Sequence, residues 1–272
     1  DRAGQIDVHE LQEAIREDTA AVSVMLANNE TGVVFPIEEI AAICRIKGVP
    51  FHTDAVQTAG KLKLDVKAMG VDFLSLSAHK LHAPKGIGLL YVRQGMAWQP
   101  YVIGGGQESG RRGGTENVAY IVAFGKAAEL AMKSVEIDVD RIRALRDRME
   151  DGIMESIPGV TRNGAKEPRL PNTSNLNFAD CEAEAILLLL DREGICASSG
   201  SACTTGSLAP SHVLIAMGVP PEHALSSVRL SLSKYSTDVE VDHLLETLPP
   251  IIEKLRGASP KASTAEAQEI SQ

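Results

Sequence analysis

The sequence LSLSAHKLHAPKGIG, residues 74–88, joins a short strand to a tight turn and carries a lysine between the two. Residues 72–77 alternate as a half-buried strand does, and Ala83–Gly86 has the composition of a turn. Lys80 therefore lies just past a strand end. An amine at this place can attack a carbonyl group, although most lysines in such positions are solvated surface residues.

Composition limits the class of protein. The chain has 272 residues, 44% of them hydrophobic, which is enough for a large core and for two domains. A net charge of −9 without a basic tract argues against nucleic acid or an anionic membrane as a partner, so we expect small substrates. Because neither a long apolar run nor a signal peptide is visible, we expect a cytoplasmic protein without a membrane span.

Four cysteines, at positions 44, 181, 196 and 203, form neither a CxxC pair nor a zinc-ligand spacing. We therefore expect no disulfide framework and no metal site, which fits a reducing cytoplasm. Cys203 differs from the others because it lies in a run of small and polar residues, 198–207. Such a run predicts an exposed, mobile loop with a reactive thiol, whereas the other three cysteines are expected to be buried apolar fillers.

Two further predicted strands end in polar residues. Residues 20–27 lead into NNETG, which contains Asn29, and residues 49–53 lead into Asp54. The carboxyl ends of parallel strands meet at one edge of an open α/β sheet, where ligands bind. We therefore expect Asn29, Asp54 and Lys80 to lie at the same edge. Taken singly, each has a simpler explanation as a turn former, a helix cap or a surface residue.

An amide, a carboxylate and an amine at one sheet edge suit a pyridine aldehyde cofactor. The lysine forms a Schiff base, and the aspartate keeps the ring nitrogen protonated, which makes the ring an electron sink. Asn29 or Gln57 can hydrogen-bond the phenolic oxygen. Ser77 and His79, just before the lysine, can donate to a phosphate.

The second half of the chain predicts a long helix followed by a smaller domain. Residues 119–131 and 135–157 have helical periodicity and should link two domains. A strand at 173–178 and a helix at 182–190 then begin an α+β domain. Arg229 interrupts a later strand, where it is either a solvated edge residue or a bidentate clamp for the α-carboxylate of an amino acid.

Six stretches together resemble the pyridoxal-phosphate-dependent cysteine desulfurases of the class-V aminotransferase family, and more narrowly the NifS- and IscS-like group. They cover most of residues 20–240 in the order that the family has them. The stretches are NNETG (28–32), FHTDAVQTAGK (51–61), SLSAHKLHAPKG (75–86), GGGQESGRRGGTEN (104–117), SSGSACTTGSLAPSHVL (198–214) and SSVRLSLSKYST (226–237).

The resemblance implies an α/β protein with the fold type I of pyridoxal-phosphate-dependent transferases. Residues 1–137 would be an incomplete large domain with a mainly parallel sheet, and residues 138–256 a small α+β domain with the cysteine loop. Residues 257–272 would be a disordered tail. The family's N-terminal part, with a phosphate-binding loop and a ring-stacking histidine, would be lacking. We therefore expect the chain alone to be poorly soluble and catalytically impaired.

The resemblance also implies roles for single residues. Lys80 would be the Schiff-base lysine and Cys203 the nucleophile that receives sulfur as a persulfide, while His79 would assist proton transfers or lie near the phosphate. Arg229 and Asn29 would bind the substrate, and no residue would bind metal. The cofactor-binding residues would be Asn29, Asp54, Gln57, Ser77, His79, Lys80 and, in the phosphate site of a partner subunit, Thr115.

The implied activity converts L-cysteine to L-alanine with pyridoxal 5′-phosphate as cofactor. The resemblance further implies a homodimer that passes sulfur to an iron–sulfur scaffold protein, in nitrogen fixation or in general cluster assembly. Another lyase or aminotransferase of the same fold, or an impaired fragment, stays open as an alternative. A nucleophilic thiol favours the desulfurase, because a transaminase needs none.

Overall fold

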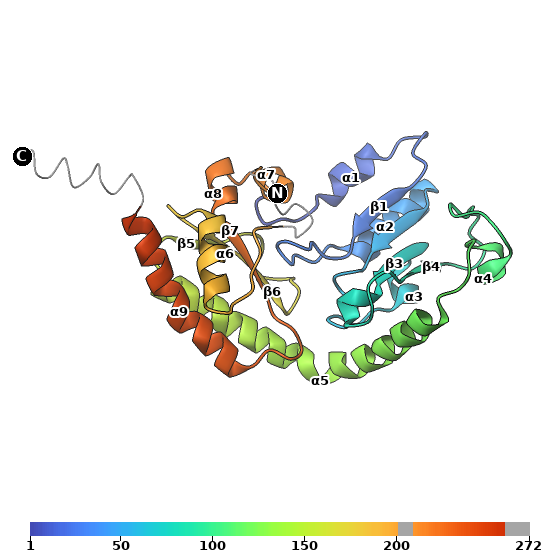
Figure 1. The fold of residues 1–272 in the computed structure, drawn as a ribbon. Coiled ribbons are helices and arrows are strands. Elements are labelled where there is room, and N and C mark those ends of the chain that lie inside the picture. The colour runs from blue at the N-terminus through green and yellow to red at the C-terminus, as the bar shows by residue number, and fades with distance from the viewer. Residues whose placement is uncertain (201–208, 259–272) are drawn as a thin grey trace, which may run out of the picture. The chain divides into compact units, whose positions relative to one another are not determined.

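The chain divides into two compact units. A computed structural model describes residues 1–200 and 209–258 (Figure 1). The N-terminal unit comprises Asp7–Ala27 and Phe35–Ile137. The C-terminal unit comprises Asp1–Ile6, Asn28–Val34 and the described residues from Asp138 onward.

A four-stranded sheet forms the N-terminal unit, in the order β1 (Val22–Met25), β2 (Phe51–Asp54), β3 (Phe73–Ser77), β4 (Gly88–Val92). The first three strands are parallel, which confirms the mainly parallel sheet that the sequence predicts. The sequence pattern did not predict β4, which pairs antiparallel with β3 and forms an edge of the sheet. In register, Asp54 lies between Met25 of β1 and Ser75 of β3.

Short helices accompany this sheet: α1 (Val8–Ala14), α2 (Ile37–Lys47), α3 (Val66–Met69) and α4 (Gln107–Gly110). Helix α2 packs against β2 and α3. It buries the apolar stripe that includes Ile40 and Cys44 and ends at Gly48, whose φ of 70° is the left-handed cap that glycine adopts without strain.

Helix α5 (Val118–Ser156) is continuous over 39 residues and belongs to both units (Figure 1). The two helical stretches that the sequence predicts are therefore one helix. In its first half, Phe124 packs into a cluster of the N-terminal unit. In its second half, Leu145, Met149 and Ile153 belong to the core of the C-terminal unit. The spacing of these three residues is the helical periodicity seen in the sequence.

The C-terminal unit is built on an antiparallel sheet in the order β5 (Val160–Arg162), β6 (Thr173–Phe178), β7 (Ser227–Ser231). The remaining helices are α6 (Ala183–Arg192), α7 (His212–Ala216), α8 (Pro221–Leu225) and α9 (Asp238–Gly257). Helix α6 packs against α9 and β7, and the apolar faces of these elements share one core with α5.

Helix α9 extends to Gly257, so the predicted tail falls, from residue 259 on, outside the described residues. Among the helices that the structure describes, none combines the length and the apolar character needed to cross a membrane.

Candidate functional site

Asp54 ends β2 and Lys80 comes shortly after β3, at the carboxyl ends of two neighbouring parallel strands. Asp54 is the last residue of β2, and its exposed carboxylate accepts a hydrogen bond at Oδ1 from the backbone N–H of Val56 (2.8 Å). Within residues 1–200 and 209–258, this is the carboxylate's one hydrogen bond. Its other oxygen therefore keeps its lone pairs for a ligand.

Lys80 lies in a 3₁₀ turn, Ala78–Leu81, that directly follows β3. Ala78 and Leu81 are buried in an apolar cluster with Phe124, so the two residues between them point outward and Lys80 is exposed. Gly60 packs closely against this turn. Its φ is 72°, and an added Cβ would lie 2.8 Å from Leu81 Cδ2. The Lys80 ammonium forms no hydrogen bond or ion pair with any described residue, so it is available for a ligand.

Three more predicted residues lie at this edge. Ser77 ends β3, and its Oγ is 2.9 Å from Nδ1 of the exposed His79. Gln57 is half-buried in the turn after Asp54, and its main-chain oxygen accepts a hydrogen bond from Lys61 Nζ (2.8 Å). The structure thus gathers five of the predicted cofactor residues: Asp54, Gln57, Ser77, His79 and Lys80. Thr115 is exposed in the connection between α4 and α5.

Sequence reasoning missed a hydrogen-bonded row beside Asp54. His52 Nδ1 is 2.7 Å from Ser23 Oγ, and His52 Nε2 is 2.8 Å from Ser75 Oγ, so one imidazole links three strands. Burial lowers the pKa of His52, and the charge of Asp54 opposes that shift. His52 and Asp54 are two residues apart on β2, which puts both side chains on one face. That spacing was the one available signal in the sequence.

Asn29 and Arg229 are joined within the C-terminal unit. Arg229 NH1 donates a hydrogen bond to the main-chain oxygen of Asn29 (2.9 Å). Burial lowers the pKa of the half-buried Arg229, and the charge of Glu30 opposes that shift. Arg229 Nε is buried and has no partner in the described part of the chain. Asn29 is thus described with Arg229, and its place beside Asp54 and Lys80 stays a prediction.

The segment that carries Asn29, residues 28–34, is attached to the C-terminal unit through its backbone. Leu170 N–H donates to the Gly32 oxygen (2.8 Å), and Val34 N–H donates to the Pro168 oxygen (3.0 Å). The bonding groups thus belong to a stretch far along the chain. No local pattern in the sequence could have predicted this attachment.

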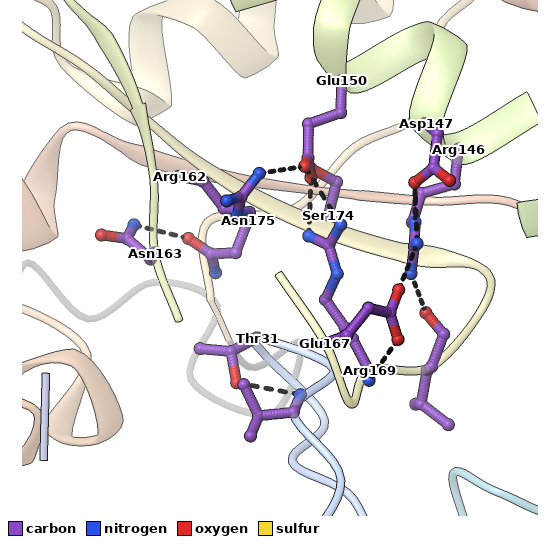
Figure 2. Close-up of polar contacts among 12 residues, drawn as sticks. Thr31, Arg146, Asp147, Glu150, Arg162, Asn163, Glu167, Arg169, Ser174 and Asn175 are labelled. Atoms are coloured by element: carbon purple, nitrogen blue, oxygen red, sulfur yellow. Dashed lines mark hydrogen bonds and ion pairs between the residues drawn. The ribbon is translucent and has the colours of Figure 1, made fainter. Parts of the chain in front are cut away.

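A buried ion network supports that attachment (Figure 2). Glu150 on α5 accepts two hydrogen bonds from Arg169 (2.6 and 3.0 Å), one from Arg162 (2.7 Å) and one from Ser174 (2.6 Å). Burial alone would raise the pKa of Glu150. The hydrogen bonds and the charge of Arg169 outweigh burial and lower this pKa from 4.5 to about 2.

The cysteines divide differently from the prediction. Cys44 and Cys181 are buried as expected, and burial raises the pKa of each thiol. Cys196 is exposed, so its predicted burial is wrong: it follows Gly194 in the connection after α6, outside any apolar helix face. Cys203 and the rest of 201–208 lie outside the described residues. No group of three or more His, Cys, Asp or Glu residues that could hold a metal ion occurs in the part of the chain that the structure describes.

Comparison with known proteins places this arrangement in a family. The family model for aminotransferase class-V matches residues 1–244. The chain belongs to the class-V aminotransferase family. Among curated relatives, "Cysteine desulfurase 2" of Trichormus variabilis is 55% identical over 260 residues, which is 96% of this chain and 65% of the relative. "Cysteine desulfurase NifS" of Azotobacter vinelandii is 50% identical over the same shares. The chain thus spans about two thirds of the length of these class-V relatives.

Two solved structures of relatives have the same fold as this chain. A "NIFS-LIKE PROTEIN" matches with a TM-score of 0.85 and 36% identity over 93% of this chain and 66% of the other. A NifS-like protein from Rickettsia africae matches with a TM-score of 0.85 and 34% identity over 93% and 68%. The resemblance stated from the sequence and the predicted type I fold are therefore confirmed.

Class-V aminotransferases of this kind use pyridoxal 5′-phosphate. The residues at the sheet edge fit that group. An exposed amine without a protein partner can form the Schiff base, and a carboxylate with an unused oxygen can accept from a ring N–H. The Ser77 hydroxyl and the His79 imidazole supply hydrogen-bond donors for a phosphate.

Proposed function

We propose that the protein containing this chain is a pyridoxal-phosphate-dependent cysteine desulfurase that converts L-cysteine to L-alanine and leaves sulfur on Cys203 as a persulfide. One observation carries the proposal: Lys80 and Asp54 offer a partnerless amine and a carboxylate at one edge of a parallel sheet. The names of relatives 50–55% identical to this chain support the choice of reaction.

The N-terminal unit would hold the cofactor. When bound, pyridoxal phosphate supplies an electron sink for charge that develops at the substrate α-carbon. Lys80 Nζ holds the cofactor and then removes the α-proton, and Asp54 keeps the ring nitrogen protonated. Ser77 and His79 would bind the phosphate, and Gln57 would bind the phenolic oxygen. The resemblance adds Asn29, from the C-terminal unit, as a second residue for that oxygen. His79 remains a candidate for assisting proton transfer as well.

The C-terminal unit would hold the substrate and receive the sulfur. Arg229 binds the α-carboxylate through its bidentate guanidinium. The Cys203 thiolate attacks the substrate sulfur, so a sulfur–sulfur bond forms while the carbon–sulfur bond of cysteine breaks. The electron pair of the broken bond stays with the carbon skeleton, which takes up a proton and leaves as alanine.

The surroundings of this reaction are proposed from the resemblance. The protein acts in the cytoplasm as a homodimer in which Thr115 contributes to the partner subunit's phosphate site. A large domain in residues 1–137 would bind the cofactor, and a small domain in 138–256 would bind the substrate and carry Cys203. An iron–sulfur scaffold protein accepts the sulfur for cluster assembly, and the NifS name of a relative favours a role in nitrogen fixation.

Two variants of the protein, at the length of its relatives and loaded with cofactor, test the proposal. Lys80→Ala should lose the absorbance of the lysine-bound cofactor and all turnover, because the cofactor aldehyde then lacks its amine. Cys203→Ser should retain cofactor and still bind L-cysteine, but it should form no persulfide. The measurements are absorbance spectra, sulfide release from L-cysteine, and mass spectrometry of the thiols.

Cys196→Ser is the matched control, because Cys196 is also exposed but has no proposed role. It should leave persulfide formation unchanged. Persulfide found on Cys196 in place of Cys203, or turnover in Lys80→Ala, would contradict the assignment. Amino-group transfer to a keto acid without sulfide release would instead support an aminotransferase.

A further inference from the structure

Glu30 is a buried carboxylate beside the proposed substrate arginine. It is 1% exposed and directly follows Asn29, whose main-chain oxygen accepts the Arg229 hydrogen bond. A buried carboxylate is costly unless hydrogen bonds or opposite charge compensate it. Ser211 Oγ donates a hydrogen bond of 2.5 Å to Glu30 Oε2. This short distance is typical of a charge-assisted bond from a hydroxyl to a carboxylate.

The backbone fixes Glu30 from both sides. The Glu30 N–H donates to Asn28 Oδ1 (2.9 Å), and the Glu30 oxygen accepts from Asn175 Nδ2 (3.2 Å). Asn175 lies on β6, in register with Arg229 on β7. The sheet that carries Arg229 therefore also holds the Glu30 backbone.

Both described flanks of the segment 201–208 lie near the Glu30 carboxylate. Gly200 precedes the segment, and a Cβ at Gly200 would lie 3.0 Å from Glu30 Oε2 and 3.6 Å from Ser211 Cβ. Ser211 follows the segment and caps α7, because its Oγ accepts from the Leu214 N–H (3.3 Å). One carboxylate thus bonds to the chain after the segment that contains Cys203 and lies close to the chain before it.

Arg229 is linked to the same flank through the backbone. Ser198 and Arg229 exchange hydrogen bonds, with N–H to oxygen distances of 3.1 and 2.6 Å. Glu30 and Arg229 form no direct ion pair, and the charge of Glu30 nevertheless favours the protonated guanidinium, opposing the fall in the Arg229 pKa that burial causes. The charge of Glu30 therefore acts on Arg229 without occupying any of its N–H groups.

We propose that Glu30 is a positioning residue that fixes the chain after the Cys203 segment, through Ser211, to the backbone that orients Arg229 and that also bonds to Ser198 before the segment. The proposal rests on the proposed function, because it ties the group that would bind the substrate carboxylate to the chain that would carry the nucleophile. Glu30 itself touches neither substrate nor cofactor in this role.

The proposal predicts opposite effects on binding and on sulfur transfer. Neutralising Glu30 removes a negative charge near Arg229, so a carboxylate ligand should bind roughly 3- to 10-fold more tightly. The same change weakens the anchor at Ser211, and misplacement of a nucleophile by about 1 Å slows a reaction by roughly 10- to 100-fold. A carboxylate that merely stabilises the fold would, when neutralised, weaken binding and transfer together.

The experiment compares Glu30→Gln, Ser211→Ala and Glu184→Gln in the cofactor-loaded protein. L-Alanine serves as the binding probe, because it has the carboxylate and no sulfur, and the absorbance of bound pyridoxal phosphate reports its binding. Glu30→Gln should bind L-alanine more tightly and form persulfide from L-cysteine at least roughly tenfold more slowly. Ser211→Ala should slow persulfide formation without tightening L-alanine binding, since it keeps the charge.

Glu184→Gln is the matched control. Glu184 and Glu30 line one cavity of about 890 Å³, but Glu184 is exposed, and the Ser211 hydroxyl bonds to Glu30 and not to Glu184. Its neutralisation should change neither measurement. Weaker L-alanine binding in Glu30→Gln, or an unchanged rate of persulfide formation in Ser211→Ala, would overturn the proposal.

A second measurement separates this proposal from the proposed function. Hydrogen exchange of the cofactor-free protein should accelerate at α7 in both Glu30→Gln and Ser211→Ala, because both weaken the anchored cap, and should not change in Glu184→Gln. If the parent protein forms no persulfide but exchange at α7 accelerates in both variants, the proposed function is wrong and the positioning role of Glu30 is supported. Unchanged exchange in Glu30→Gln would refute the anchor whatever the reaction.

Discussion

The two units present their polar groups in opposite ways. In the C-terminal unit, polar side chains are buried and hydrogen-bonded to each other, as the four bonds to Glu150 illustrate. In the N-terminal unit, Asp54 and Lys80 lie exposed at a sheet edge with unused bonding capacity. The two units also differ in how much apolar surface they expose. Most of the exposed large hydrophobic side chains belong to the N-terminal unit.

The C-terminal unit thus contains a satisfied, buried polar network, whereas the N-terminal unit exposes polar groups at the carboxyl ends of its strands. A buried network whose donors and acceptors are satisfied makes a rigid arrangement, and breaking it is costly. A sheet edge with unsatisfied groups gains little for the fold but offers them to a ligand. Arg229 lies between these cases, since one of its nitrogens bonds to the Asn29 backbone and Nε has no partner in the described chain.

The largest expected effect comes from Glu150→Gln in the C-terminal unit. The substitution removes the charge that compensates Arg169, whose side chain is 0% exposed. Breaking a buried pair by removing one partner costs roughly 3–5 kcal/mol. Urea unfolding followed by circular dichroism should show this loss. Trp98, the one tryptophan of the chain, lies in the N-terminal unit, so the transition seen in its fluorescence should not shift.

Arg148→Ala is the control for this experiment. Arg148 is two residues away on the same helix and pairs with Asp242 at 2.5 Å, but both side chains are largely exposed. Exposed pairs contribute about 0–1 kcal/mol, so the loss should be small. An equal loss in both variants, or an equal shift of the Trp98 signal in Glu150→Gln, would contradict the contrast between the units.

Acid should weaken the same network without a mutation. The pKa of Glu150 is lowered in the folded chain from 4.5 to about 2, so its contribution is complete above pH 4.5 and is lost as the pH falls toward 2. A shift of this size corresponds to roughly 3 kcal/mol. The difference in unfolding free energy between the parent and Glu150→Gln should therefore narrow over this pH range. A difference independent of pH would show that Glu150 is not ionised in the network.

The sequence predicted the positions of Asp54 and Lys80 at the sheet edge better than it predicted the buried network around Glu150. Asp54 and Lys80 follow strands with clear alternation or a turn composition, so their positions follow from local patterns. Glu150, Arg162 and Arg169 meet from a helix, a strand and a loop, and no periodicity connects them. The attachment of residues 28–34 to residues 168–170 likewise depends on contacts distant in sequence.

Three further features differ from the sequence-based predictions, or were absent from them, for reasons that can be given residue by residue. GLLYV at 88–92 is apolar without alternation, so its pattern does not distinguish the antiparallel strand β4 from other buried segments. The row from Ser23 through His52 to Ser75 requires the register of three strands, which the sequence does not specify. Cys196 was assigned by the general burial of cysteine, and its exposed connection after α6 overrides that tendency.

A smaller effect should arise at the turn that presents Lys80. Gly60 and Gly86 both have positive φ, 72° and 85°, but only at Gly60 would an added Cβ meet a neighbour, 2.8 Å from Leu81 Cδ2. Gly86→Ala should cost about 1 kcal/mol through the left-handed backbone alone. Gly60→Ala should cost about 2 kcal/mol, because it also displaces Leu81 from its cluster. Unfolding followed by Trp98 fluorescence measures both, and equal costs would refute the close packing under Lys80.

The smallest effect on stability should come from the exposed apolar residues of the N-terminal unit, although their effect on association should be clear. Leu89 and Leu90 on β4 are 46% and 49% exposed, and Val122 and Met132 on α5 are 65% and 75% exposed. Large exposed apolar surface promotes association. Replacing these four by Thr, Thr, Gln and Gln should raise the monomeric fraction of residues 1–272 in light scattering, with unfolding free energy changed by less than about 0.5 kcal/mol. Val239→Gln, equally exposed in the C-terminal unit, should not. A gain from Val239→Gln alone would assign the association to the other unit.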